Sequence, residues 1–217
     1  MNLRAAWVAL APTALAISGS ACAREKPPRP VQPNPSAVFA AEIAFNRLAR
    51  EEGQWTAFRE TAADDAVMFV PQQVNAKTWL KDRANPPAPV QWQPYRIYVS
   101  CDGRTAASTG AWQLPDGSAG YFTTIWRLDD KDEWRWVLDH GDALKQPLAP
   151  QDAVKGRVAT CKRGERSRDG VKPGERPVDQ SLMWDYVVGD DASRAVRVRM
   201  WNGEGYDLVI DDKVAAS

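Results

Sequence analysis

The stretch EWRWVLDHGD, residues 133–142, decides the fold. Its alternation of apolar and polar residues predicts a long β-strand, in which successive side chains point to opposite faces. A regular strand places on one face Trp134, Trp136, Leu138, His140 and Asp142, and on the other Arg135, Val137 and Asp139. Two tryptophans and a leucine on one face need a core to cover them. We therefore expect His140, the only histidine, where a covered face meets solvent, at either a pocket mouth or a plain strand end.

The composition is that of a soluble globular protein with one large domain, or one domain and a smaller appendage. The chain has 217 residues, of which 44% are hydrophobic and 26% are charged. Lys and Arg, 28 together, balance 28 Asp and Glu, so no global field attracts nucleic acid and no nucleic-acid partner is expected. Ten tryptophans are many for this length, and we expect most of them in the core or in a pocket wall.

The N-terminus predicts export. Residues 1–21 combine Arg4, an apolar run too short for an ordinary membrane span, and small residues before Cys22. Residues 19–22, GSAC, resemble a bacterial lipobox, although glycine stands where leucine is usual. A lipobox would direct attachment of lipid to Cys22. The alternative is ordinary signal-peptide cleavage after Ala23. The proline-rich segment 22–35 would act as a tether and favours the lipoprotein. We expect a periplasmic or outer-membrane-anchored protein that touches a membrane only through Cys22.

Export leads to an oxidising compartment, where cysteines pair. Cys101 and Cys161 are the cysteines of the folded part, and we predict a disulfide between them, with two buried free thiols as the alternative. No CxxC motif or His/Cys cluster is present, so neither a metal nor another cofactor is expected.

Periodicity and turn signals predict the elements. Ser36 is expected to cap a long helix whose buried face carries Ala40, Ile43, Ala44 and Leu48 and which stops at Gly53. The remaining predictions are short helices at 54–61 and 76–83, a strand at 66–70, and a four-strand antiparallel meander at 91–101, 105–113, 119–128 and 134–141. Residues 143–180 are expected to hold a helix at 151–160 and an exposed basic loop. Strands at 181–188, 195–201 and 205–210 form a C-terminal extension, 181–211, which either joins the main sheet or stands apart.

The order of these elements, with ADDAVMF at 63–69 and WRWVLD at 134–139, resembles the SnoaL-like, DUF4440 branch of the nuclear-transport-factor-2-like (NTF2-like) superfamily over residues 36–142. The resemblance implies an α+β fold, in which helices pack on a curved antiparallel sheet and leave a cone-shaped cavity. It does not specify a function, because this fold serves many unrelated roles.

The catalytic candidates are His140, Asp142, which shares its face, and the adjacent Asp139. A carboxylate near an imidazole raises the imidazole pKa and orients its proton, which suits general acid–base catalysis. Enzymes of the resembled superfamily, such as ketosteroid isomerases, polyketide cyclases and limonene epoxide hydrolases, place carboxylates or histidine inside the cone. The alternative is a polar strand end bonded to the following loop.

The ligand-binding candidates are Tyr98, Tyr121, Trp126 and Trp136, which line either an apolar pocket or simply the core. Our preferred hypothesis is an exported, non-catalytic protein that binds a small apolar ligand or a protein partner. The alternative is a SnoaL-like isomerase, cyclase or hydrolase that uses His140 with a nearby carboxylate. A third hypothesis is a structural envelope protein, whose homodimer is implied by the resemblance.

Overall fold

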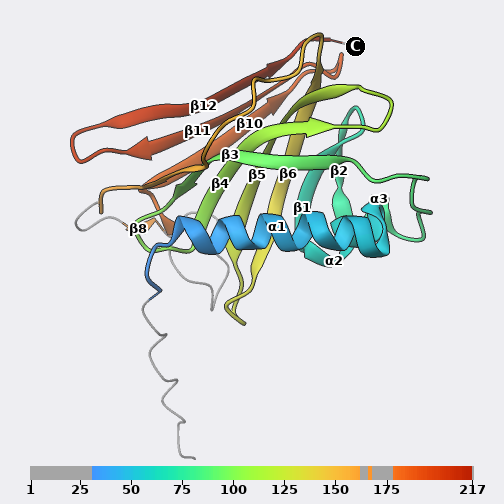
Figure 1. Ribbon diagram of the computed structural model, residues 1–217. Helices are drawn as coiled ribbons and strands as arrows, with labels where there is room; N and C mark the ends of the chain where they lie inside the picture. The colour runs from blue at the N-terminus through green and yellow to red at the C-terminus, as the bar shows by residue number, and fades with distance from the viewer. Residues whose placement is uncertain (1–30, 162–165, 168–177, 217) are drawn as a thin grey trace, which may run out of the picture.

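The computed structural model describes residues 31–161, 166–167 and 178–216 (Figure 1). The predicted signal peptide, the lipidation site at Cys22 and most of the proline-rich tether therefore lie outside the described residues, as does most of the basic loop. Among the described residues, no helix is long and apolar enough to cross a membrane.

The chain forms three layers: helices, a seven-stranded sheet and a three-stranded sheet (Figure 1). The helices are α1 (Pro35–Glu52), α2 (Gln54–Thr61) and α3 (Ala76–Leu80). The large sheet runs in the order β2-β1-β6-β5-β4-β3-β7. Its strands are β1 (Ala62–Phe69), β2 (Gln73–Asn75), β3 (Gln91–Val99), β4 (Thr105–Gln113), β5 (Ala119–Leu128), β6 (Trp134–Leu144) and β7 (Lys155–Val158). The small sheet contains β10 (Leu182–Val188), β11 (Arg194–Trp201) and β12 (Tyr206–Val214); β8 (Arg166–Ser167) pairs with β9 (Val178–Asp179).

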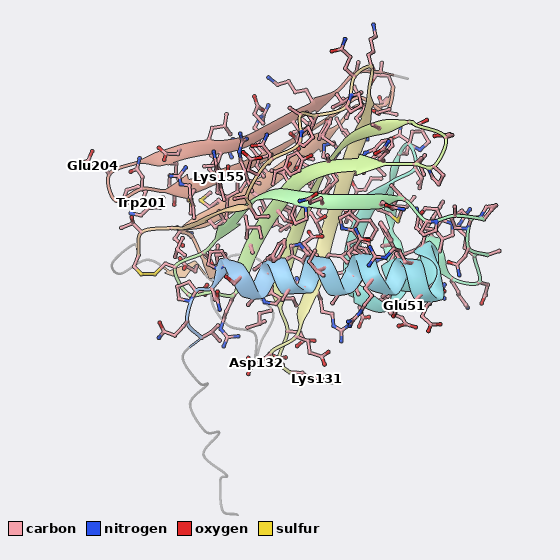
Figure 2. The ribbon with its side chains drawn as sticks, in the orientation of Figure 1. Glu51, Lys131, Asp132, Lys155, Trp201 and Glu204 are labelled. Atoms are coloured by element: carbon pink, nitrogen blue, oxygen red, sulfur yellow. A yellow bond between two sulfur atoms is a disulfide. The ribbon has the colours of Figure 1, made fainter. Side chains whose placement is uncertain are left out.

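This architecture confirms the predicted fold class, an α+β cone with a C-terminal β-rich extension. The antiparallel meander β3–β4–β5–β6 forms as expected, and β1 joins it in parallel beside β6. Charged side chains of turns and of the outer helix surface, such as Lys131, Asp132 and Glu51, point away from the layers (Figure 2). Apolar side chains fill the spaces between the layers.

The buried face of α1 differs from the predicted one. Asn34, not Ser36, caps the helix by accepting a hydrogen bond from the Ser36 backbone N–H. The residues that face the sheet are Val38, Glu42, Phe45, Asn46 and Ala49, whereas Ile43 remains 43% exposed. The prediction was wrong because it chose the buried face by apolar residues alone, and this helix buries two polar residues, Glu42 and Asn46.

A bulge in β6 reverses the predicted faces of its C-terminal half. Trp136 pairs with Trp126, but the next pair joins Leu138 to Ile125, so that Val137 is an extra residue in β6. Trp136 therefore shares the helix-facing side with Asp139, while Leu138 and His140 face the small sheet. The predicted single face of Trp134, Trp136, Leu138, His140 and Asp142 was wrong, because one inserted residue shifts the alternation.

The predicted helix at 151–160 was also wrong. Residues 155–158 form β7, which pairs in parallel with β3 at the edge of the large sheet. Gly156 and Val158 are poor helix formers, and the open edge of β3 supplies backbone partners that an isolated helical turn would lack.

The C-terminal strands form a separate sheet that packs on the outer face of the large sheet, opposite α1 (Figure 1). Apolar side chains on its inner face are almost fully buried: Leu182, Val196, Val198, Met200 and Ile210. Tyr186 meets Phe69 of β1 edge to face, with ring centroids 5.7 Å apart. The extension thus completes the core on the side that the helices leave uncovered.

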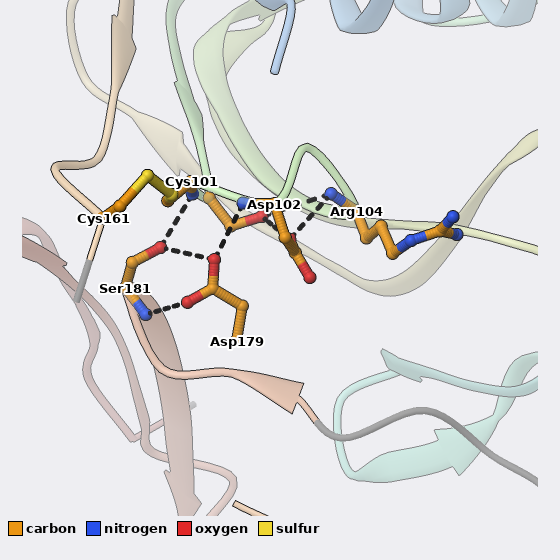
Figure 3. The surroundings of a disulfide bond; sticks show 7 residues. Cys101, Asp102, Arg104, Cys161, Asp179 and Ser181 are labelled. Atoms are coloured by element: carbon orange, nitrogen blue, oxygen red, sulfur yellow. Dashed lines mark hydrogen bonds between the residues drawn. A yellow bond between two sulfur atoms is a disulfide. The ribbon is translucent and has the colours of Figure 1, made fainter. Parts of the chain in front are cut away.

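The predicted Cys101–Cys161 disulfide is confirmed and closes a separation of 60 residues (Figure 3). Hydrogen bonds beside it attach Asp179 and Ser181, which precede β10, to the same turn. The Cys101 backbone N–H donates to Ser181 Oγ at 2.7 Å, and the Asp102 N–H donates to Asp179 Oδ2 at 2.8 Å. Asp179 in turn accepts from both the backbone and the hydroxyl of Ser181.

Replacing both cysteines, Cys101→Ser with Cys161→Ser, should lower the free energy of unfolding by about 2–4 kcal/mol, because the crosslink restricts the unfolded chain. Urea denaturation of the variant and of the oxidised protein measures the difference. The reduced wild-type protein serves as the control and should match the variant. Equal urea midpoints for variant and oxidised protein would contradict the expected stabilisation.

Candidate functional site

A cavity of about 410 Å³ lies between the helices and the large sheet, within the range typical of small-molecule sites. Its wall is mostly aromatic: Phe45, Trp55, Phe58, Phe69, Trp92, Trp112 and Phe122 all line it. These rings are packed edge to face; the centroids of Phe45 and Trp92, for example, are 4.7 Å apart. Aliphatic side chains, Gln54, Thr124 and residues 139–143 of β6 complete the wall.

Asp139 is one of two acidic residues in this wall, with Asp142. The bulge at Val137 turns it toward the helices, where the hydroxyl of Thr124 donates a hydrogen bond to Oδ2 at 2.8 Å. Burial raises the pKa of Asp139 to about 7, against the opposing effect of the Thr124 bond, and the charge of Glu42 raises it further. Near neutral pH this group can therefore hold or release a proton, which an ordinary surface aspartate cannot do.

A second carboxyl group, Glu42 of α1, is fully buried beneath the cavity. The indole N–H of Trp92 donates to Oε2 at 2.9 Å, the indole N–H of Trp126 donates to Oε1 at 3.0 Å, and the hydroxyl of Ser108 also bonds to Oε1. Burial raises the pKa of Glu42, and these hydrogen bonds oppose the rise. Sequence analysis missed this residue, although Trp92, Ser108 and Trp126 fall on one face of adjacent strands and could have indicated a common partner.

His140 faces the small sheet rather than the cavity. Its Nδ1 accepts a hydrogen bond from Arg194 Nε at 3.0 Å, which places the proton of the neutral ring on Nε2. Nε2 lies 3.6 Å from Asp212 Oδ2, which accepts a hydrogen bond from Thr123. Burial, aided by the charge of Arg194, lowers the His140 pKa to about 3. The imidazole is therefore neutral at physiological pH and connects the two sheets.

The structure separates the predicted catalytic residues. Asp139 faces the cavity, whereas Asp142 pairs with Tyr121 on the outward-facing side of the sheet and accepts a hydrogen bond from the Ala143 backbone N–H. The charge of Asp142 contributes to the raised pKa of Tyr121, after burial and Asp212. All three residues line the cavity, but the side chains of His140 and Asp142 lie on the opposite face of the sheet from that of Asp139.

The predicted ligand-binding residues are also divided. Tyr98 pairs with Ala107 and Tyr121 with Ala111 on the outer side of the sheet. Trp126 and Trp136 lie on the cavity side but are buried in the core beneath it, where Trp136 donates to Thr61 Oγ1 at 3.0 Å. None of these four side chains belongs to the cavity wall.

Three other hollows of the described surface are larger, and the carboxyl residues that line two of them are exposed. One, of about 570 Å³, is lined by uncharged residues that include Gln91, Gln113 and Tyr95. A second, of about 550 Å³, follows the exposed side of α1 beside Trp134. A third, of about 450 Å³, is lined mainly by basic residues that include Arg59 and Lys81. Within the described ranges, no group of three or more His, Cys, Asp or Glu side chains is placed to hold a metal ion.

Comparison with known proteins gives matches in structure only. No family model matches the chain, and no curated protein matches it in sequence. One similar solved structure is a protein of Parabacteroides distasonis provisionally assigned as a ketosteroid isomerase, with 18% identity, a TM-score of 0.42, and coverage of 54% of this chain and 98% of that chain.

Two further solved structures match over a similar share of the chain. An NTF2-like protein of unknown function from Shewanella baltica has 12% identity, a TM-score of 0.39, and coverage of 51% and 94%. The Δ5-3-ketosteroid isomerase of a Mycobacterium species has 18% identity, a TM-score of 0.36, and coverage of 49% and 92%. Each match therefore covers about half of this chain and nearly all of the other, smaller protein.

Glu42→Ala should lower the free energy of unfolding by about 2–4 kcal/mol, because it removes the acceptor of the Trp92 indole N–H and one of the two acceptors of the Trp126 indole N–H, and opens a cavity. Urea denaturation measures the loss. Glu51→Ala, on the exposed side of the same helix, is the matched control and should change stability by less than about 0.5 kcal/mol. Similar losses of unfolding free energy in the two variants would show that the hydrogen bonds to Glu42 do not hold the helix against the sheet.

Asp139 should make the protein less stable as the pH rises from about 4 to 7. The folded state keeps the Asp139 proton up to about pH 7, while the unfolded chain loses it near the ordinary value of 3.8. Stability from this group is thus present below pH 3.8 and lost through pH 7, by up to about 4 kcal/mol.

Asp139→Asn cannot titrate and should lack this contribution. The measurement is the difference in unfolding free energy between wild type and variant at pH 5 and at pH 8, which cancels the effects of other groups. If wild type and variant differ in unfolding free energy by the same amount at pH 5 and at pH 8, the raised pKa of Asp139 would be contradicted. Asp152→Asn, at an exposed position, is the charge-matched control.

Proposed function

We propose that this protein binds a small, largely apolar organic molecule in the aromatic cavity and does not transform it. The observation that carries the proposal is a cavity of about 410 Å³ whose wall is dominated by aromatic side chains, with the acidic residues Asp139 and Asp142 among them. Small-molecule sites typically combine such an apolar wall with few polar groups that fix the orientation of the ligand.

Binding without catalysis is favoured because the polar groups needed for a reaction do not converge. His140 is engaged between the sheets with Arg194, so it is not available as a general base in the cavity. Asp139 has Thr124, a neutral hydroxyl, as its hydrogen-bonded neighbour. General acid–base catalysis requires a positioned donor and acceptor near the same substrate atoms.

The second candidate function is an isomerase or hydrolase of the SnoaL-like type, and one observation favours it. A carboxyl group with a pKa of about 7 is well matched to proton transfer at neutral pH. Under this hypothesis Asp139, rather than His140, would be the acid or base. Turnover of a bound compound that disappears in Asp139→Asn, with binding retained, would favour this candidate.

We also propose that the protein is exported and anchored through lipid on Cys22, as a member of the SnoaL-like branch. The support is the signal-like sequence at 1–21 and the proline-rich tether, together with a disulfide, which is typical of oxidising compartments. A diacylglyceryl mass on Cys22 in protein from its own membrane fraction would support the anchor. A chain beginning at Arg24 would contradict it. The homodimer remains a prediction.

Ligand binding can be tested by native mass spectrometry of protein purified from the cells that produce it. We expect a retained small molecule that is lost on denaturation. Val90→Trp adds bulk to the cavity wall and should reduce retention at least about tenfold, since overpacking excludes the ligand. Val187→Trp, at a 58% exposed position of β10, is the matched control and should retain the molecule. Equal retention in both variants would place the ligand outside the cavity.

A further inference from the structure

The cavity wall carries acidic but no basic side chains. The lining residues include Asp139 and Asp142 and no lysine or arginine, and Glu42 lies close enough to raise the Asp139 pKa. The only histidine of the wall, His140, has its ring directed to the small sheet, where Arg194 donates to it. The wall therefore offers no positive group to an anionic ligand and repels one.

Arg194 is the basic residue that comes near this wall, and it is held on the far side. It donates to His140 Nδ1 at 3.0 Å and to the carbonyl of Gly141 at 2.7 Å. Its guanidinium carbon also lies 5.2 Å from the centroid of the Phe69 ring. These contacts fix Arg194 between the two sheets, so it does not neutralise Asp139 in the cavity.

Asp139 has an unused acceptor. Thr124 bonds to Oδ2, while no described residue donates a hydrogen bond to Oδ1. An ionised carboxylate in apolar surroundings is costly unless a positive group pairs with it. Asp139 can avoid this cost either by keeping its proton or by pairing with a cation that enters the cavity.

The aromatic wall supplies the second component of a cation site, beside the Asp139 carboxylate. Positive charge is attracted to the faces of Trp, Phe and Tyr rings, and tryptophan is the best of the three. Trp55, Trp92 and Trp112 all line the cavity. Rings and one carboxylate together suit an amine or quaternary ammonium group, which is attracted by both.

We propose that the ligand of this cavity is an organic cation, an amine or quaternary ammonium compound whose apolar body packs against the aromatic rings and whose positive nitrogen pairs with Asp139. The inference rests on the proposed ligand-binding function and specifies the ligand class. Pairing with a cation favours the ionised form of Asp139, and the raised pKa means that binding at pH 7 should release protons.

The test uses three probes with the same naphthyl skeleton and different charge: naphthylmethylamine, naphthylmethanol and naphthoate. Isothermal titration calorimetry of the full chain measures each affinity at pH 7. We expect the amine to bind roughly 10- to 100-fold more tightly than the alcohol, as a charge-assisted hydrogen bond allows, and naphthoate to bind most weakly. Titrations of the amine in two buffers of different ionisation enthalpy should reveal proton release.

Asp139→Asn preserves the shape of the side chain and an acceptor for Thr124. It should reduce amine affinity by roughly 10- to 100-fold and leave alcohol affinity within about threefold. The alcohol thus also reports that the variant is folded. Asp152→Asn removes an exposed charge and should leave all three affinities unchanged.

The outcomes separate the two proposals. Equal affinities for amine and alcohol, or an amine affinity unaffected by Asp139→Asn, would overturn the cation site while leaving small-molecule binding in place. Tighter binding of naphthoate would also overturn it. Failure of all three probes, together with a bare polypeptide in native mass spectrometry, would overturn ligand binding itself.

Discussion

The hydrogen bonds that converge on the buried carboxyl group of Glu42 hold α1 against the sheet. Their donors come from three adjacent strands, through Trp92 of β3, Ser108 of β4 and Trp126 of β5. The helix cannot move by one turn without taking the carboxyl acceptor away from these three donors, which is costly. Because Trp92 also lines the cavity, the same contact that fixes the helix also sets the position of the cavity wall.

The sequence predicted the long strands of the meander and of the C-terminal extension, but not the short strands β2 and β7 or which way the side chains of β6 face. The meander and the C-terminal strands were visible because alternation and turn residues mark each strand separately. The bulge at Val137 leaves no such mark, since an inserted apolar residue looks like a continuation of the strand. It nevertheless decides the site, because it places Asp139 in the cavity and His140 between the sheets.

Two other differences between the predicted and the observed structure have the same cause: a local sequence pattern does not show which distant residues a segment will contact. Residues 155–158 become a strand because the edge of β3 offers them hydrogen bonds. Glu42 is buried because donors from distant parts of the chain meet there, so a helix face chosen by apolar residues alone misses it. The Cys101–Cys161 pairing was predictable, in contrast, because few cysteines leave few alternatives.

The large sheet ends in two very short strands. Its flanking strands, β2 and β7, have three and four residues, whereas the strands between them have eight to eleven. An edge strand exposes unpaired backbone groups that can recruit another chain, and a short edge offers few of them. The long, aromatic-rich strands that form the cavity are thus kept inside the sheet, which protects the molecule from edge-to-edge aggregation through its largest sheet.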